Sequence, residues 1–369
     1  MIKRFEVCNF KGFKKNMIID FTAREYEYNK HLVQKGIVNK AIVYGKNGIG
    51  KSSFGIALFD IIGHLTDKER MNFIYLQNYR NLDSDSEEVR FKYVFQFDLC
   101  EVEYEYYKAN YDYLLREKLS FDGKVVVNFD YFNRDENYID KQYWGDLNVD
   151  LIDNKLSVLK YIYRNTPTDT EAPLTQMIQF CENMLWYRCL SEGNSYSGFT
   201  NGGSFLVEKL YESGKLEDFK KFLKENDLSY NLKFESINGR HQLMAMFHKG
   251  KNSVPFETVA STGTKALFLF YIWSISSFKQ ISFLFIDEFD AFFHYEAAES
   301  IINRLNKSIS FQSVVTSHNT YLMQNKLTRP DCCYIMTEDR ISSLFNCTDK
   351  EIREAHNLEK MYINGVFNV

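Results

Sequence analysis

The sequence predicts an α/β protein with a mostly parallel core sheet, an antiparallel β subdomain and a helical insertion. Three observations support this fold class. Short apolar strands alternate with helical patterns near both ends of the chain, alternating apolar residues dominate 89–129, and helical spacing dominates 130–233. Strands that alternate with helices are typical of a covered parallel sheet, whereas two-residue alternation is typical of a half-buried antiparallel sheet.

The insertion separates two parts of one head in this prediction. We assign 1–129 to the N-terminal part of the head, 130–233 to the helical insertion and 234–369 to the C-terminal part. The chain has 369 residues, of which 45% are hydrophobic and 16% aromatic, so it can fill a sizeable core. Its net charge of -4 provides no global basic field, and nucleic acid stays an open partner.

Cysteine usage and hydropathy indicate a cytoplasmic protein. Seven cysteines are scattered without a CxxC pair, so neither a disulfide framework nor a zinc site is expected. The first residues lack the apolar core of a signal peptide, and no run approaches the roughly 18 apolar residues that cross a bilayer. We therefore expect no membrane contact.

The N-terminal part begins with two short strands within 1–21, around a turn at Lys11-Gly12. An apolar strand at 41–44 runs into a glycine-rich loop, and apolar residues at helical spacing predict a helix over 51–65. A meander of antiparallel strands is expected over 89–129. This order predicts a strand, loop and helix unit beside an antiparallel sheet.

The rest of the chain is expected to contain helices, a hairpin and short parallel strands. Within the insertion, helical segments are predicted at 151–164, 174–190 and 214–225, with a loop at 193–204. Beyond it we expect a hairpin over 230–247, a buried helix over 265–278, and parallel strands at 281–286 and 313–316 separated by a helix.

The glycine-rich loop fits GxxxxGK[ST] and lies between a strand and a helix, as that motif requires. Its backbone N–H groups and the positive end of the helix would hold phosphates, while Lys51 supplies a charge and Ser52 a hydroxyl for Mg²⁺. A glycine-rich turn that ends in Lys-Ser by chance is the weaker interpretation. The candidate ligands are Gly45, Asn47, Gly48, Gly50, Lys51, Ser52 and Ser53.

Two carboxylates, Asp287 and Glu288, end the apolar run that starts at Phe283. Asp287 would hold the metal ion together with Ser52, and Glu288 would orient or deprotonate an attacking water molecule. Two acids at a strand end are often only solvated loop residues. The phosphate loop upstream favours the catalytic interpretation.

A histidine and a helix start complete the set of candidate residues. His318 ends the strand at 313–316 and is placed to contact a terminal phosphate or the attacking water, although a lone histidine is more often structural. Ser261, Gly263 and Thr264 precede the buried helix and offer a hydroxyl and free N–H groups to an anion. Taken alone, that segment is an ordinary helix N-cap.

With these motifs in this order, the chain resembles the ABC-class ATPase heads of the SMC, RecF and OLD proteins. The resemblance implies an ABC-type P-loop ATPase head with ATP and Mg²⁺ as cofactors, in which two heads sandwich two nucleotides. It implies that Ser261, Gly263 and Thr264 act on the nucleotide of a partner copy in a homodimer. It also implies that Lys11 approaches the nucleotide and that Asp290 lies in the D-loop.

The end of the chain, 357–367, resembles the tail of compact bacterial AAA ATPases of phage-defence operons, such as the ATPase components of AbiL-like and PARIS-like systems. The segments 261–265 and 287–294 point the same way. Two features depart from the family pattern. The segment between the phosphate loop and the meander has no clear Q-loop motif, and we assign Gln77 to that position. The chain after His318 is expected to be too short for the TOPRIM nuclease of OLD proteins.

The resemblance implies an ATP-hydrolysing, homo-oligomeric sensor or switch of an anti-phage system, which controls a separate effector protein from the same operon. The alternative is a RecF/SMC-like DNA-maintenance ATPase that binds DNA on its ATP-closed dimer. A transporter subunit is disfavoured because the signature is not LSGGQ, and an SMC-like arm because the insertion is too short for a long coiled coil. The candidate DNA contacts are Lys11, Lys14, Lys15, Lys220, Lys221 and Lys224.

Overall fold

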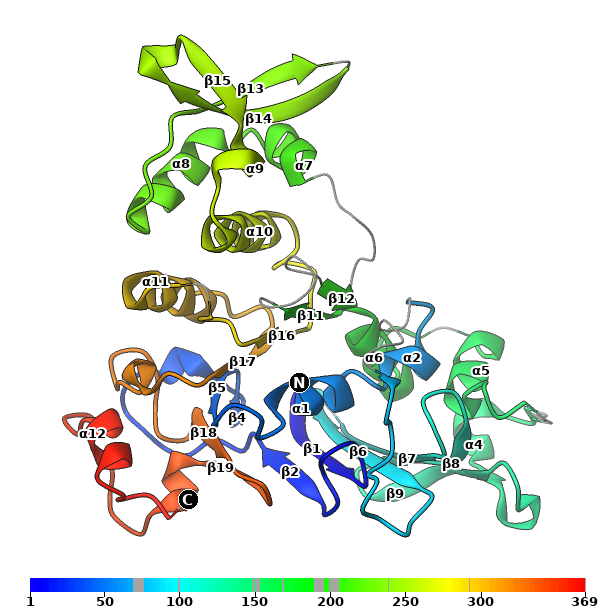
Figure 1. The fold of residues 1–369 in the computed structure, drawn as a ribbon. Helices are drawn as coiled ribbons and strands as arrows, with labels where there is room; N and C mark the ends of the chain where they lie inside the picture. The colour runs from blue at the N-terminus through cyan, green and yellow to red at the C-terminus, as the bar shows by residue number, and fades with distance from the viewer. Residues whose placement is uncertain are drawn as a thin grey trace.

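Two seven-stranded sheets and the helices around them form the body of the molecule in the computed structural model (Figure 1). The predicted α/β class, with a mostly parallel sheet beside an antiparallel one, is confirmed. No helix of the described residues has both the length and the apolar character needed to cross a bilayer. The structure describes residues 1–68, 76–98, 100–147, 149, 153–167, 169–188, 196–198, 206–237, 239–291 and 293–368.

The parallel sheet has the strand order β12-β11-β16-β17-β5-β18-β19. The five inner strands run parallel, and antiparallel β12 and β19 close its edges. β5, β16 and β17 are buried along their whole length, as expected for strands covered on both faces. The strands are β5 (Lys40–Tyr44), β11 (Met184–Arg188), β12 (Tyr196–Gly198), β16 (Phe283–Asp287), β17 (Gln312–Ser317), β18 (Cys333–Met336) and β19 (Ile341–Ser343).

The antiparallel sheet has the order β10-β9-β8-β7-β6-β1-β2 and confirms both the N-terminal strand pair and the meander. Alternate residues of β7 are buried, so one face of this sheet supplies much of the core. Its strands are β1 (Ile2–Cys8), β2 (Met17–Asp20), β6 (Val89–Gln96), β7 (Glu101–Lys108), β8 (Leu114–Phe121), β9 (Lys124–Asp130) and β10 (Tyr138–Ile139); a separate pair is formed by β3 (Val33–Gln34) and β4 (Ile37–Val38).

The helix after the phosphate loop packs against both sheets. The ring of Phe54 contacts Phe5 of β1 with centroids 5.6 Å apart, and a Cβ added at Gly55 would lie 2.5 Å from the ring of Phe285 on β16. The single helix predicted over 51–65 is wrong, because the chain turns at Phe59–Ile61 and forms α1 (Lys51–Leu58) and α2 (Ile62–Leu65). In this turn Asp60 pairs with Lys108 of β7.

The range predicted as an insertion contributes strands to both sheets. β10 joins the antiparallel sheet, and β11, within the predicted helix 174–190, pairs in parallel with β16. A short apolar run is compatible with a helix or with a strand. Here it forms a strand because its backbone pairs with the edge of β16. Of the loop at 193–204, residues 196–198 form β12, and the others lie outside the described residues. The helices are α4 (Lys141–Trp144), α5 (Val158–Asn165), α6 (Pro173–Glu182), α7 (Leu206–Ser213) and α8 (Leu216–Glu225).

A small three-stranded sheet lies at the far end of the molecule, beyond α7, α8 and α9 (Figure 1). It confirms the predicted hairpin and extends it by one strand. The buried helix α10 lies between this end and the parallel sheet, and α11 follows β16 (Figure 1). The elements are β13 (Leu232–Ile237), β14 (Arg240–Phe247), β15 (Asn252–Pro255), α9 (Phe256–Val259), α10 (Thr262–Ser276), α11 (Tyr295–Asn306) and α12 (Leu358–Ile363).

Candidate nucleotide site at the carboxyl edge of the parallel sheet

Three neighbouring strands bring the candidate residues to one edge of the sheet. β17 lies between β16 and β5, and all three run in the same direction. The phosphate loop follows β5, the two acids end β16, and His318 follows β17. Carboxyl ends of parallel strands are the usual ligand edge of such sheets. The Gly45 N–H donates to the Ser317 carbonyl at 3.3 Å, so the loop is anchored to the end of β17.

Glycine is required at several positions of the phosphate loop. Gly48 and Gly50 have φ of 80° and 107°, a region that side chains with a Cβ rarely adopt. A Cβ on Gly45 would lie 2.9 Å from the Ile49 side chain and 3.2 Å from the Met336 carbonyl oxygen. Gly50 is the N-cap of α1 and offers no side-chain hydrogen bond, which leaves the first N–H groups of the helix available to an anion.

Lys51 is buried beneath this loop. Its Nζ donates to the carbonyl oxygens of Gly45 at 2.7 Å and Lys46 at 3.0 Å. Burial lowers the pKa of Lys51, and the charges of Glu288, Asp287 and Asp290 oppose that shift. The ammonium group therefore lies in the field of the acids that end β16.

Other loop residues differ in exposure. The structure leaves Asn47 and Gly48 exposed, and Ser52 and Ser53 at the start of α1 are half-buried. Their positions keep the outer surface of the loop accessible.

Asp287 has one carboxylate oxygen in use and one free. Its Oδ1 accepts a hydrogen bond from the Thr316 hydroxyl at 2.8 Å. Its Oδ2 is buried and has no hydrogen-bond partner among the described residues. An orphaned buried carboxylate oxygen needs a partner, and a carboxylate with a serine hydroxyl and phosphate oxygens is a donor set that suits Mg²⁺. Asp287 and Ser52 therefore fit the metal ion that the motif implies.

Glu288 follows Asp287 in a left-handed backbone conformation, with φ of 47°. Its N–H donates to the Thr316 hydroxyl at 2.8 Å, and the next N–H, of Phe289, donates to the Thr316 carbonyl at 3.2 Å. Such a conformation is uncommon for a residue other than glycine, and it turns the half-buried glutamate away from the strand direction.

Asp290 is 2% exposed, and its carboxylate is hydrogen-bonded to the end of β17 and to the turn after it. Its Oδ2 accepts hydrogen bonds from Ser317 Oγ and from Asn319 Nδ2, both at 2.7 Å. These two residues flank His318, which is exposed at the end of β17. The side chain expected in the D-loop thus holds the turn that carries the histidine.

The structure brings Lys11 and Gln77 together. Lys11 Nζ donates to the backbone carbonyl of Gln77 at 2.7 Å, and burial lowers the pKa of this lysine. Phe10 and Phe13 close the predicted turn with reciprocal backbone bonds of 3.0 and 2.7 Å. The ring of Phe13 lies against Gly50, where an added Cβ would be 2.9 Å away. This turn therefore borders the phosphate loop, while the Gln77 side chain is exposed.

The segment at 261–264 starts α10, on the other face of the parallel sheet from α1. Leu284 and Ile286 of β16 belong to the core that contains α10, whereas Phe285 packs on α1. Ser261 caps the helix: its Oγ accepts from the Thr264 N–H at 3.1 Å and lies 2.9 Å from the Thr264 hydroxyl. Thr264 is 1% exposed, Ser261 is exposed and Gly263 is half-buried.

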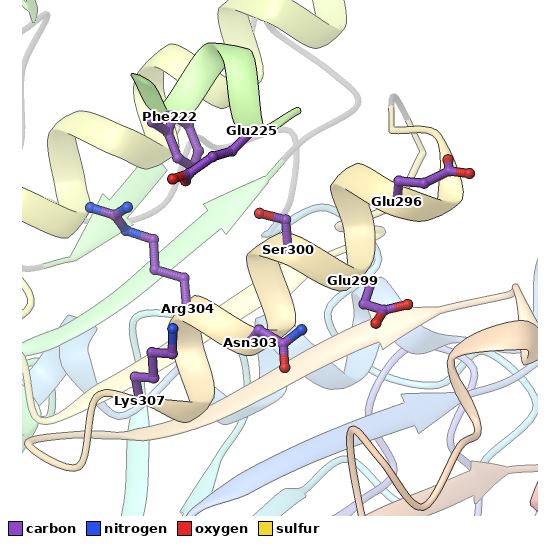
Figure 2. A pocket seen from close by; sticks show the side chains of 8 residues that line it. All are labelled: Phe222, Glu225, Glu296, Glu299, Ser300, Asn303, Arg304 and Lys307. Atoms are coloured by element: carbon purple, nitrogen blue, oxygen red, sulfur yellow. The ribbon is translucent and has the colours of Figure 1, made fainter. Parts of the chain in front are cut away.

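A cavity of about 640 Å³ lies apart from these residues, between α8 and α11. Figure 2 shows Arg304 and Lys307 at one end of it and Glu296 at the other. The Arg304 guanidinium rests 5.1 Å from the centre of the Phe222 ring. None of the motif residues lines this cavity, so it is separate from the candidate nucleotide site.

Sequence reasoning missed Thr316, Ser317 and Asn319. The only signal was a polar run, Thr-Ser-His-Asn, at the end of an apolar strand. Their partners lie on β16 and in the turn after it, so the contacts depend on the pairing of two strands.

This chain is similar to solved structures and to a protein-family model. No curated protein matches it. Among solved structures, an Smc head bound to the C-winged helix domain of ScpA shares 15% identity over 93% of this chain and 97% of that chain, with a TM-score of 0.47. An SMC head domain from Thermotoga maritima shares 16% identity over 93% of this chain and 98% of that chain, with a TM-score of 0.42.

A family model described as "AAA domain, putative AbiEii toxin, Type IV TA system" matches residues 40–324. This span is most of the chain and includes the phosphate loop, the segment at 261–264, both acids and His318. The protein therefore belongs to this AAA-domain family.

Proposed function

We propose that this protein binds and hydrolyses ATP with Mg²⁺ in sites shared between two copies of the chain, and that it is the sensor or switch of an anti-phage system. The observation that carries the ATPase proposal is the unpartnered Oδ2 of Asp287, buried beside the phosphate loop and Lys51. In the part of the chain that the structure describes, no hydrogen bond uses that oxygen.

Each residue at the edge has a distinct role in this proposal. The loop N–H groups and Lys51 bind the phosphates, whose oxygens replace the carbonyls of Gly45 and Lys46 as acceptors for Nζ. Mg²⁺, held by Ser52 and Asp287, neutralises phosphate charge. Glu288 orients or deprotonates the attacking water, and His318 contacts the terminal phosphate from its exposed position at the end of β17.

The position of the 261–264 segment supports a site shared between copies. It lies on the opposite sheet face from α1, and Ser261 is exposed. Ser261 and Gly263 would cap the terminal phosphate held by the partner copy. Thr264 is buried and bonded to Ser261, so its contribution is to shape that cap. Nucleotide shared by two copies stabilises the closed dimer by its differential affinity for that state.

Defence is supported by the family description, which names a toxin of a type IV toxin–antitoxin system. A toxin paired with a second gene product agrees with an ATPase that controls a separate effector protein. ATP binding would close the dimer, and hydrolysis would reset it.

The DNA-maintenance alternative has less support in the structure. Lys220 pairs with Glu217 at 2.6 Å, and Lys15 lies 3.5 Å from Asp339. These pairings reduce the cation density that a phosphate backbone requires.

The test uses Glu288→Gln, which should retain ATP, lower turnover by about 10²- to 10⁴-fold and accumulate the closed dimer. We would measure ATPase rate and solution mass with and without ATP and Mg²⁺, after co-expression with the neighbouring genes. Lys51→Ala is the control that should form no ATP-dependent dimer. Turnover at the wild-type rate in Glu288→Gln would contradict the catalytic assignment, and co-purified DNA without a protein partner would favour the alternative.

A further inference from the structure

One threonine hydroxyl contacts both acids of the site. Thr316 is fully buried near the end of β17. Its Oγ1 donates to Asp287 Oδ1 at 2.8 Å and accepts from the Glu288 N–H at 2.8 Å. A hydroxyl has one hydrogen to donate and lone pairs to accept, so a single group satisfies both bonds together. The two acids are therefore held by the same atom.

For Asp287 this contact determines which oxygen is available. Because Oδ1 is occupied by the hydroxyl, the carboxylate cannot rotate freely, and among the described residues Oδ2 is left without a partner. That is the oxygen assigned above to Mg²⁺. Without the hydroxyl, both oxygens would lack a protein partner and the carboxylate could reorient toward Lys51, whose pKa already responds to it.

For Glu288 the contact holds an unfavourable backbone. Its φ of 47° persists only where surrounding bonds enforce it. The Thr316 side chain binds the Glu288 N–H and the Thr316 carbonyl binds the following N–H of Phe289. One residue of β17 thus fixes the first two amides of the turn and with them the direction of the glutamate.

Thr316 is itself held in a fixed place. It pairs with Val43 in the register between β17 and β5, one residue before the strand end that anchors the phosphate loop through Gly45. A shift of the acids relative to the loop would therefore require a shift of the hydroxyl relative to the sheet.

We propose that Thr316 is the positioning residue of the hydrolytic site, which aligns the metal-binding oxygen of Asp287 and the backbone of Glu288 through one hydroxyl. This inference rests on the proposed ATPase function. Thr316 touches neither nucleotide nor water in this proposal and acts only through the two acids.

The test compares Thr316→Val, which replaces the hydroxyl by a methyl of similar size, with Thr316→Ser, which keeps the hydroxyl. Valine leaves the Glu288 N–H and an Asp287 oxygen unpaired. We expect kcat to fall about 10- to 100-fold in Thr316→Val, with KM for ATP changed by less than about threefold. Thr316→Ser should recover kcat to within about threefold of the wild type. Thr175→Val, at a buried threonine of α6, is the control for loss of a hydroxyl from the core.

A second readout does not depend on turnover. The affinity of a non-hydrolysable ATP analogue is measured as Mg²⁺ is titrated, and Thr316→Val should require several-fold more Mg²⁺ for half-maximal binding while Thr316→Ser should not. Equal kcat and equal Mg²⁺ dependence in Thr316→Val and the wild type would overturn the inference and leave the ATPase proposal intact. Loss of activity in Thr316→Ser as well would also overturn it, since the hydroxyl is present there. A wild type that neither binds nor hydrolyses ATP would instead refute the proposed function.

Discussion

Buried charged groups of the antiparallel sheet and two buried carboxylates at the edge of the parallel sheet differ in how completely they are paired. In the antiparallel sheet, Glu117 accepts hydrogen bonds from two tyrosines, a serine and a backbone N–H, and Lys108 lies 2.6 Å from Asp60 with both side chains at most 5% exposed. At the edge of the parallel sheet, Asp287 and Asp290 each keep one buried oxygen without a partner in the described part of the chain.

The difference separates structural charges from charges kept for a ligand. A fully paired buried charge is costly to disturb but does nothing further, because its hydrogen-bonding capacity is used. A half-paired buried carboxylate is unfavourable until something binds it. Mutations in the first sheet should therefore lower stability, and mutations at the second edge should lower binding or turnover.

The largest effect on stability is expected for Lys108→Met. The change removes the ion pair to Asp60 and leaves a buried carboxylate with only the hydroxyls of Tyr79 and Tyr106. We expect the free energy of unfolding to fall by about 3–5 kcal/mol, measured by urea denaturation. Lys141→Met breaks the exposed pair to Asp146 and should leave the free energy of unfolding nearly unchanged. Equal losses in the two variants would contradict the structural assignment.

A smaller effect, of a different kind, is expected for Lys51→Ala. Its ammonium hydrogen-bonds two carbonyls of the phosphate loop and closes no ion pair at salt-bridge distance among the described residues, so we expect the free energy of unfolding to fall by less than in Lys108→Met. Affinity for ATP should fall roughly 10- to 100-fold, because charge-assisted bonds to phosphate are lost. Titration of a fluorescent ATP analogue measures this. A larger loss of stability in Lys51→Ala than in Lys108→Met would contradict the assignment of Lys51 to ligand binding and of Lys108 to stability.

The smallest effect concerns pH and Glu117. Burial raises the pKa of Glu117 above its ordinary value of 4.5, although four hydrogen bonds oppose the shift. A pKa raised by folding means that the stabilising contribution is complete below pH 4.5 and is lost as the pH rises through the folded-state value. Glu117→Gln cannot titrate, so its unfolding free energy should decline less between pH 5 and pH 8 than that of the wild type, while ATP affinity is unchanged.

Urea unfolding at several pH values tests this prediction. Other titrating groups act equally in both proteins, including Glu6, whose pKa is lowered by hydrogen bonds from Asn16 and Arg90 despite its burial. Only the difference between the two curves is therefore interpreted. Parallel curves would show that Glu117 keeps its ordinary pKa in the fold.

The features that could be predicted from the sequence are local. The phosphate loop, its strand and the acid pair are contiguous motifs whose residue types follow from their chemistry, and the structure places them at one edge. β11 was missed because Met184–Arg188 is a short apolar run, and only the edge of β16 makes it a strand. Thr316 was missed because its role appears only when β16 and β17 are aligned in register.

The order of strands in the parallel sheet also has a consequence for how the chain matures. The neighbours of β5 in the sheet are β17 and β18, which lie near the other end of the sequence. During synthesis the phosphate loop therefore emerges long before the strands that hold it, and contacts of such separation form late and slowly. A nascent chain cannot complete this site before β17 and β18 have emerged, so we expect nucleotide capture to begin only after these strands have been made.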